Sequence, residues 1–342
     1  MSGGAGHARR RTLAWMAGAA VLAVGLAAAA LTPPPAPKAR KEVGALVAPA
    51  FAARAGEVAS ITVTTVEETY HIVHGPDGWV EPERGNYKVA SGRIDELVHA
   101  ISGMRFAAPM TRDDKKFDRI GLGDPKQGGT GALVEIAGPN RDTLLKILVG
   151  FRDGRSYVRE PDDLQAWAVK ADGMPPLQRG ARWLDLEVVA LPAGSIREVE
   201  VRLVGRPAYR LTPKDPEGAQ FSVAPPFDQR RPVAAFAATL PGQALRHFSP
   251  TDVAPLATLK DAKPVADHVT RIANGLEVTV HASKLGDRGW ASVSARVEPA
   301  ASAEAAAQAA QINARAAGWG FALGANDWSA FATPLEALVE PK

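Results

Sequence analysis

The chain of 342 residues contains no cysteine. This absence excludes disulfide bonds, thiolate metal ligands, cysteine nucleophiles and a lipid-modified N-terminal cysteine. A domain of this size can fold on its hydrophobic core alone. The absence of cysteine is therefore compatible with a periplasmic protein.

The sequence has no excess of charge outside its first residues. The formal net charge is +3, and Arg9, Arg10 and Arg11 account for all of it, so residues 32–342 hold 37 basic and 37 acidic residues. A nucleic-acid groove needs a concentrated basic surface. The balance therefore argues against a nucleic-acid partner.

The sequence also lacks the local motifs of common catalytic sites. Gly-x-Ser-x-Gly, a Walker loop and His-Glu-x-x-His are all absent. We therefore predict no enzyme activity and assign no catalytic, cofactor-binding or metal-binding residues.

One long uncharged run, residues 13–31, directly follows the three arginines. As a helix it would span roughly 28 Å, close to the ~30 Å hydrocarbon core of a bilayer. A secretory signal has a shorter apolar region, so we predict an uncleaved anchor over residues 12–31, with a cleaved signal peptide as the alternative. The arginines favour cytoplasmic residues 1–11. The chain is then a single-pass protein of the bacterial inner membrane, with its body in the periplasm.

The remaining chain is predicted to form a linker and two similar units. Prolines between residues 33 and 37 favour an extended chain, and residues 32–56 form the predicted linker. The fold class is α+β, with residues 57–194 and 195–342 each forming an antiparallel sheet covered by one packed helix.

The similarity of the two units depends on segments that recur in the same order. Strands of β-branched residues begin at Ile61 and Val199. The two helices are predicted from apolar residues at i, i+3, i+4 and i+7, namely Ile94, Leu97, Val98 and Ile101, and Val233, Phe236, Ala237 and Leu240. The paired strands that follow are residues 132–137 with 144–149, and 276–281 with 291–297. The closing segments are residues 157–159 and 166–169 in the first unit, and 319–322 and 330–333 in the second. An alanine-rich helix near residues 301–317 interrupts only the second unit.

Three motifs have both a functional and a structural interpretation. His71 and His74 could form a metal pair, but an odd spacing on a strand directs them to opposite faces. Residues 121–126 begin like a dinucleotide fingerprint, but Lys126 replaces the third glycine, and a tight turn is predicted instead. The charged residues 113–116 are typical of a solvated loop.

Six tryptophans lie outside the predicted anchor, near the ends of predicted strands: Trp79, Trp167, Trp183, Trp290, Trp319 and Trp328. At such positions we expect them to seal small cores rather than to stack on a ligand.

Four short motifs follow one another along the chain. They are residues 77–79 before the first helix, Phe-Asp-Arg-Ile-Gly-Leu-Gly-Asp-Pro at 117–125, Val-Gly at 149–150 leading to Tyr-Val-Arg at 157–159, and Trp-Leu-Asp-Leu at 183–186. Together they resemble a bacterial domain-of-unknown-function family, number forty-three forty, over roughly residues 58–205. The resemblance implies one N-terminal membrane helix, a large extracytoplasmic part and an association with ABC-type export systems, including gliding-motility-like auxiliary components. That family has no established catalytic residues.

We therefore predict a membrane-anchored, non-catalytic interaction domain that accompanies an ABC-type permease or an envelope complex. A second hypothesis is a ligand-binding module, in which a cleft between the units, near residues 191–195, holds a glycan, a lipid or a peptide. A third is a hydrolase whose residues meet only in the fold.

Overall fold

The computed structural model describes residues 41–341. From Val43 onward these residues belong to one compact unit. The predicted anchor, the residues before it that are predicted to be cytoplasmic, and the first part of the predicted linker lie outside the described residues. Within residues 41–341, no helix is long and apolar enough to cross a membrane.

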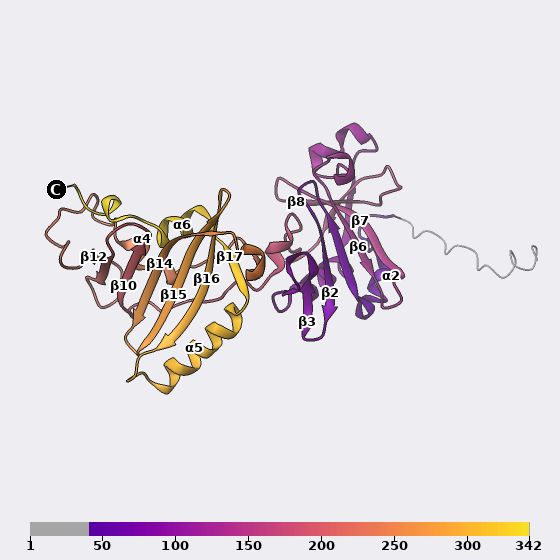
Figure 1. Ribbon diagram of the computed structural model, residues 1–342. Coiled ribbons are helices and arrows are strands. Elements are labelled where there is room, and N and C mark those ends of the chain that lie inside the picture. Colours follow the sequence, from indigo (N-terminus) through magenta and orange to yellow (C-terminus); the bar gives the residue numbers. More distant parts are fainter. Residues whose placement is uncertain (1–40, 342) are drawn as a thin grey trace, which may run out of the picture. The chain divides into compact units, whose positions relative to one another are not determined.

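Two antiparallel sheets form the unit (Figure 1), which confirms the predicted α+β class. The first sheet has nine strands in the order β4-β3-β2-β1-β6-β7-β8-β9-β5. These strands are β1 (Ser60–Thr64), β2 (Thr69–Gly75), β3 (Gly78–Glu81), β4 (Tyr87–Lys88), β5 (Arg105–Pro109), β6 (Ala132–Ala137), β7 (Thr143–Arg152), β8 (Arg155–Arg159) and β9 (Trp167–Lys170).

The second sheet has eight strands in the order β12-β11-β10-β14-β15-β16-β17-β13. These strands are β10 (Ile196–Leu203), β11 (Tyr209–Pro213), β12 (Phe221–Val223), β13 (Asp252–Pro255), β14 (Lys263–Ile272), β15 (Leu276–Leu285), β16 (Arg288–Val297) and β17 (Trp319–Ala322). When β1 to β3 are matched with β10 to β12, and β5 to β9 with β13 to β17, the two strand orders are identical, and β4 is an additional edge strand.

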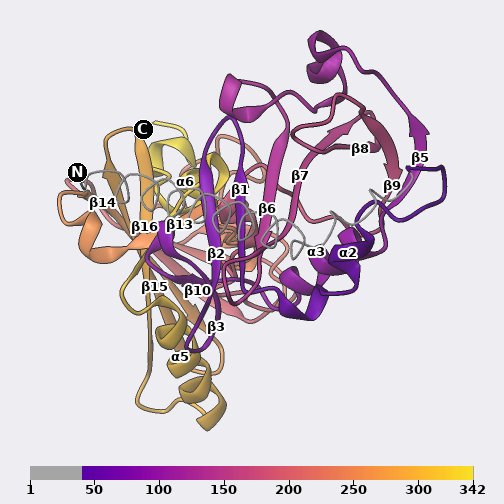
Figure 2. The same ribbon diagram turned by 90° about the vertical axis from the view of Figure 1, so that its right-hand side faces the viewer.

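The first sheet carries apolar side chains on both faces. Ala132, Val134 and Ile136 of β6 face the larger core, whereas Leu133 faces a smaller core on the opposite side. The larger core is covered by α3 (Arg93–Ser102), which directs Ile94, Leu97 and Ile101 into it, and α3 lies beside α2 (Pro49–Ala52) (Figure 2). The predicted first helix is thus confirmed, although it begins after Gly92 and receives no side-chain cap from Ser91.

The end of the predicted linker belongs to the fold. The Gly44 N–H donates to the Phe106 carbonyl over 2.7 Å, and the Val47 N–H donates to Met104 over 2.9 Å. Phe51 of α2 is buried in the larger core. Residues 44–47 therefore pair along edge strand β5 and α2 packs on the sheet, so the folded part begins before residue 57. The prolines that predicted an extended linker lie at residues 33–37, before this segment.

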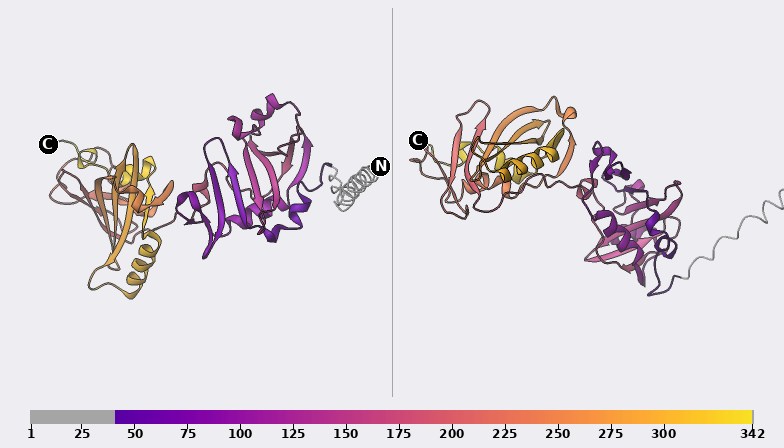
Figure 3. Two further views of the ribbon diagram at one scale, coloured as in Figure 1. Left: turned by 45° about the vertical axis from the view of Figure 1, so that its right-hand side comes forward. Right: turned by 90° about the horizontal axis from the view of Figure 1, so that it is seen from below.

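Three helices cover the core of the second sheet (Figure 3). They are α4 (Thr239–Gly242), α5 (Ala303–Ala316) and α6 (Ala325–Phe331). The alanine-rich helix predicted in the second unit is α5, which begins with a Ser302 side-chain cap and packs along β16. Its buried face consists of Ala305, Ala309, Ile312 and Ala316.

The helix predicted over residues 233–240 does not form. Only α4 is helical there, and Val233, Phe236 and Leu240 are exposed. The apolar period is real, but the predicted helix has only eight residues, too few to be stable without burial, and three of its four apolar side chains remain exposed. The second sheet is covered by α5, α6 and the short α4 instead of by one long helix at this position.

The strand matching in the second half of the repeat is also corrected. Strand β14 is not predicted from the sequence, because proline is its second residue and charged residues lie among its apolar ones. Residues 319–322 form β17, which corresponds to β9 rather than to β8. Residues 330–333 end α6 and form no strand.

Candidate functional site

The two histidines considered as a metal pair lie on β2 and are exposed. His71 Nδ1 is 2.5 Å from the Glu83 carboxylate, and the His74 ring packs edge-on against Trp79. Within residues 41–341, no group of three His, Cys, Asp or Glu side chains is arranged to hold a metal ion.

The glycine motif at residues 121–126 forms the predicted turn. It joins the 3-10 helices η3 (Asp114–Ile120) and η4 (Pro125–Gln127), and Gly121 adopts the left-handed conformation. Asp113 caps the start of η3 by accepting from the Lys115 N–H. The charged residues thus begin a short helix rather than a loop, and their role is structural.

Two of the motifs shared with the family meet on the outer face of the first sheet. The Arg159 guanidinium lies 4.5 Å from the Phe117 ring centroid and donates to the carbonyl of Pro161 over 2.7 Å. A Cβ at Gly150 would overlap the Gly121 carbonyl, so a glycine allows the turn to approach β7. These residues therefore seat the turn on the sheet.

Tryptophans seal the cores as expected. Trp167, Trp183 and Trp290 are buried. The Trp183 indole N–H donates to the Tyr70 hydroxyl over 3.0 Å, and that hydroxyl donates to the Leu177 carbonyl over 2.9 Å. This chain of bonds fixes the segment that follows β9, and burial raises the pKa of Tyr70 far above its ordinary value.

That segment, residues 171–178, forms one wall of a groove of about 680 Å³. The floor is the inner face of the first sheet at the end of β1, the start of β6 and the end of β7. The apolar lining residues are Val66, Ala132, Val149, Phe151, Ala171, Met174, Pro175, Pro176 and Leu177. Val66 and Phe151 stand at the rim with 56% and 65% of their surface exposed. The cleft predicted near residues 191–195 corresponds instead to a separate pocket of about 420 Å³, between that connection, β14 and α5.

The register of the strands shows what occupies the equivalent place in the second sheet. The row Val63–Val134–Ile147 matches Val201–His268–Val280, since each residue pairs with the next and both rows face the core. One row further along, Ala132 and Val149 on the groove floor match Ala266 and Ala282. When residues are counted along the paired strands in this way, Ser156 is equivalent to Gly289, and Phe151 is equivalent to Lys284. Ala171, the residue after β9, is equivalent to Ala325, the first residue of α6.

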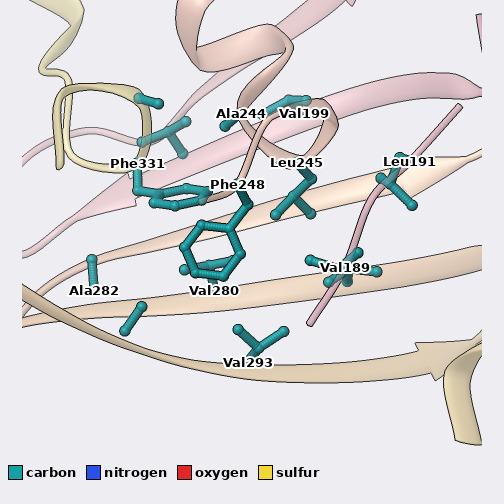
Figure 4. Packing of buried hydrophobic residues seen from close by; sticks show 14 of the residues in the cluster. Val189, Leu191, Val199, Ala244, Leu245, Phe248, Val280, Ala282, Val293 and Phe331 are labelled. Carbon is teal, nitrogen blue, oxygen red and sulfur yellow. The ribbon is translucent and has the colours of Figure 1, made fainter. Parts of the chain in front are cut away.

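In the second sheet this place is filled. Helix α6 follows β17 and contacts β14 and β15. Phe331 is fully buried and packs edge-on against Phe248, with 5.2 Å between the ring centroids (Figure 4). It also packs edge-on against His268 at 5.2 Å. A Cβ at Gly289 would overlap the Trp328 ring. In the first sheet the corresponding segment contains Pro175 and Pro176, which disfavour a helix, and the groove remains.

A second feature joins the two sheets through a cluster of charged side chains, of which Glu81 is fully buried. Arg84, in the 3-10 helix η2 (Pro82–Arg84), contacts Glu81 and Glu68 of the first sheet, and its Nε donates to Asp252 of β13 over 2.6 Å. Asp252 also accepts from Arg288 over 3.1 Å. We call these five residues the ionic junction.

The protonation of the ionic junction follows from burial. Glu81 is fully buried, and desolvation raises its pKa to about 7 although Arg84 acts in the opposite sense. One Glu81 oxygen, Oε2, has no hydrogen-bond partner. For Asp252, desolvation is the largest single influence and favours the neutral form, but the hydrogen bonds and charge of Arg84 act together with the Val253 N–H and Arg288 to lower the pKa.

His268 is the most buried titratable group of the second sheet. Its Nε2 lies 2.9 Å from the Pro241 carbonyl, and desolvation lowers its pKa to about 4. A neutral ring that is sealed under Phe331 cannot reach a substrate, so His268 supports the core rather than chemistry.

Comparison with protein families gives one match. The family described as Domain of unknown function (DUF4340) matches residues 79–266, more than half of the chain. The chain belongs to this family. No curated protein and no solved structure matches it significantly. The DUF4340 match begins at β3 and ends in β14, so it includes the ionic junction residues Glu81, Arg84 and Asp252.

Neither the groove nor the ionic junction was predicted from the sequence. The groove lining comes from segments up to about a hundred residues apart, and Arg84 and Asp252 are separated by 168 positions. A local motif cannot report such pairs. The sequence does contain one local signal, the double proline Pro175-Pro176 after β9, which disfavours a helix there, but no prediction was drawn from it.

Proposed function

We propose that the protein is a single-pass protein of the bacterial inner membrane whose periplasmic body is a non-catalytic interaction module. It serves as an accessory component of an ABC-type transporter or of another envelope complex. The observation that carries this proposal is the open groove of the first sheet, at a place that the second sheet closes with its own α6. An exposed apolar rim on a soluble domain is typical of a binding surface.

The attachment of the tether supports the same proposal. The chain that leaves the predicted anchor pairs along edge strand β5 from Gly44 onward. The eleven residues 32–42 between them extend to at most about 40 Å. The body is thus held within reach of membrane partners, and the protected edge strand cannot pair with other sheets.

Affinity purification of the tagged full chain from gently solubilised membranes tests this function. We expect a permease or an ATPase to copurify. A matched control is a full chain with Phe151→Lys, which places at the groove rim the charge found at Lys284, the equivalent position of the second sheet. Reproducible recovery of the protein alone would contradict the proposal. Protease added to intact spheroplasts should cleave the body if it faces the periplasm.

A second candidate function is the binding of a small periplasmic ligand, either a glycan, a lipid or a peptide. The volume of the groove favours it, because about 680 Å³ lies within the range of small-molecule sites, roughly 300–1,000 Å³. Mass spectrometry of the protein under native conditions, after purification without detergent exchange, would show a bound species of defined mass.

We also propose that the two units arose by internal duplication. The identical strand order and the matching rows of core residues support it. Under this proposal, α5 and β4 are later additions, and the groove and α6 are two outcomes for one ancestral position.

A further inference from the structure

The groove and α6 occupy equivalent positions over equivalent strands. We call the place above these strands the seat. In the second sheet the seat lies above Ala266 and Ala282, and α6 fills it with Phe331 and places Trp328 against Gly289. In the first sheet the seat above Ala132 and Val149 has the same floor, built from small and β-branched residues. The second sheet therefore shows what chemistry such a seat accepts.

We propose that the groove binds a short apolar segment of a partner protein, and that an aromatic side chain of this segment takes the place that α6 fills in the second sheet. The inference rests on the proposed function, because it names what the interaction module recognises. It assigns the segment to another protein, not to residues 1–40, a second copy of the chain or a lipid.

The scarcity of charged side chains in the groove favours an apolar ligand. Glu67 is the one ionisable side chain among its lining residues, and it already pairs with Arg179, whose Nε lies 2.6 Å from the carboxylate. A charged ligand group would find no free countercharge there. At the rim, Phe151 stands where the second sheet has Lys284. An exposed phenylalanine beside the open seat can contact an apolar ligand. The closed seat binds no ligand, so a lysine beside it can face water.

The walls of the groove are held in place before any guest arrives. The Leu177 carbonyl accepts from Tyr70, and the Gln178 carbonyl accepts from the Thr65 hydroxyl over 3.3 Å. These bonds fix the C-terminal end of the proline-containing segment that forms the wall, and its other end continues directly from β9. A preformed seat loses little conformational entropy on binding, so a single aromatic side chain can contribute much of the affinity.

Site-specific photo-crosslinking in the full chain, in its own membranes, tests the inference. A benzophenone amino acid replaces Phe151 in one variant and Lys284 in the other, so that equivalent positions of the two sheets are compared. We expect adducts at position 151 and not at position 284. Sequencing of the adduct should give an apolar segment with an aromatic residue from another protein. An adduct with lipid, with a second copy or with residues 1–40, or equal yields at both positions, overturns the inference.

Two further measurements separate groove binding from misfolding. A peptide with the sequence of residues 324–332 should reduce crosslinking at position 151, and the same peptide with Trp328 and Phe331 replaced by alanine should be roughly tenfold weaker. Ser156→Trp places an indole where Trp328 lies in the second sheet. It should abolish crosslinking without lowering the midpoint of thermal unfolding. Crosslinking that persists in a folded S156W chain overturns the inference.

The outcome is distinguishable from failure of the proposed function. If affinity purification recovers a transporter while position 151 gives no adduct, the interaction module stands and the groove is not its seat. If purification recovers no partner, and neither the peptide nor any protein segment reaches position 151, both proposals fail together.

Discussion

The two sheets share one strand order, but they close the same end of their inner face in different ways. In the second sheet, α6 seals the end with Phe331, and the core is complete. In the first sheet, a proline-containing segment passes over that end and leaves a groove. The comparison shows that strand order fixes where a seat lies, whereas the segment after the last strand decides whether the chain fills it. In this protein the groove is therefore a position in the fold rather than an accident of loop packing.

The largest effect should come from emptying the closed seat. Phe331→Ala removes a fully buried ring that packs on Phe248 and His268. We expect the free energy of unfolding to fall by about 4 kcal/mol, because both apolar transfer and a new cavity contribute. Urea denaturation measures it. Met174→Ala, on the half-buried wall of the open groove, is the control and should cost less than half as much. Equal costs would mean that the two ends are not different.

The ionic junction should respond next most strongly. Arg84→Ala leaves the buried Glu81 and Asp252 without their main cation, and the expected loss is about 3 kcal/mol. Arg288→Ala removes a half-exposed partner of the same aspartate and should cost at most about 1 kcal/mol. Denaturation followed separately by tryptophans of each sheet would show whether the sheets uncouple. If both arginine variants behave alike, the junction is not a buried network.

The pH dependence of stability should reveal Glu81. Its pKa is raised from 4.5 to about 7, so the folded state binds this proton more tightly than the unfolded state does. Its stabilising contribution is complete below pH 4.5 and is lost as the pH rises through about 7. Between about pH 5 and about pH 8, the free energy of unfolding should fall by roughly 2 kcal/mol.

Asp252 acts in a different pH range. Its pKa is lowered, so its contribution is present above the ordinary value of 3.8 and is lost only in stronger acid. Glu81→Gln should therefore make the free energy of unfolding nearly independent of pH between about pH 5 and about pH 8. The loss of stability in stronger acid should stay unchanged. A profile that is as steep in the glutamine variant would assign the titration to another group.

How far the sequence predicted this fold depended on whether the signal was local. The strands at Ile61, Ala132 and Val199 were predicted because β-branched and apolar residues are concentrated there. Helix α3 was predicted because its apolar period coincides with a buried face. The period over residues 233–240 was as clear, yet only its last two residues are helical, in α4, because the segment is short and other helices already cover the sheet.

The candidate site was beyond sequence reasoning for a different physical reason. Strand β14 alternates charged and apolar residues, with His268 inside the core, so its hydrophobicity is low although it is central in the sheet. Without β14 the strands of the two units were matched one position out of step. Only the corrected pairing places Ala132 opposite Ala266 in the comparison, and only then do the groove and α6 fall on the same place.

The smallest expected effect comes from adding one methyl group at Gly289, which tests the equivalence of Gly289 and Ser156. Gly289 and Ser156 are equivalent positions, but a Cβ at Gly289 would overlap the Trp328 ring, whereas Ser156 already carries one at the groove. Gly289→Ala should cost about 1 kcal/mol, since the half-exposed tryptophan can shift partly out of the way. Ser156→Ala should change the free energy of unfolding by less than about 0.5 kcal/mol. Thermal unfolding of the two variants, with Trp328 fluorescence as the reporter, measures both. If Gly289→Ala is neutral and leaves the emission of Trp328 unchanged, α6 does not lie on that strand as closely as the structure has it, and the seat in the second sheet is not truly closed.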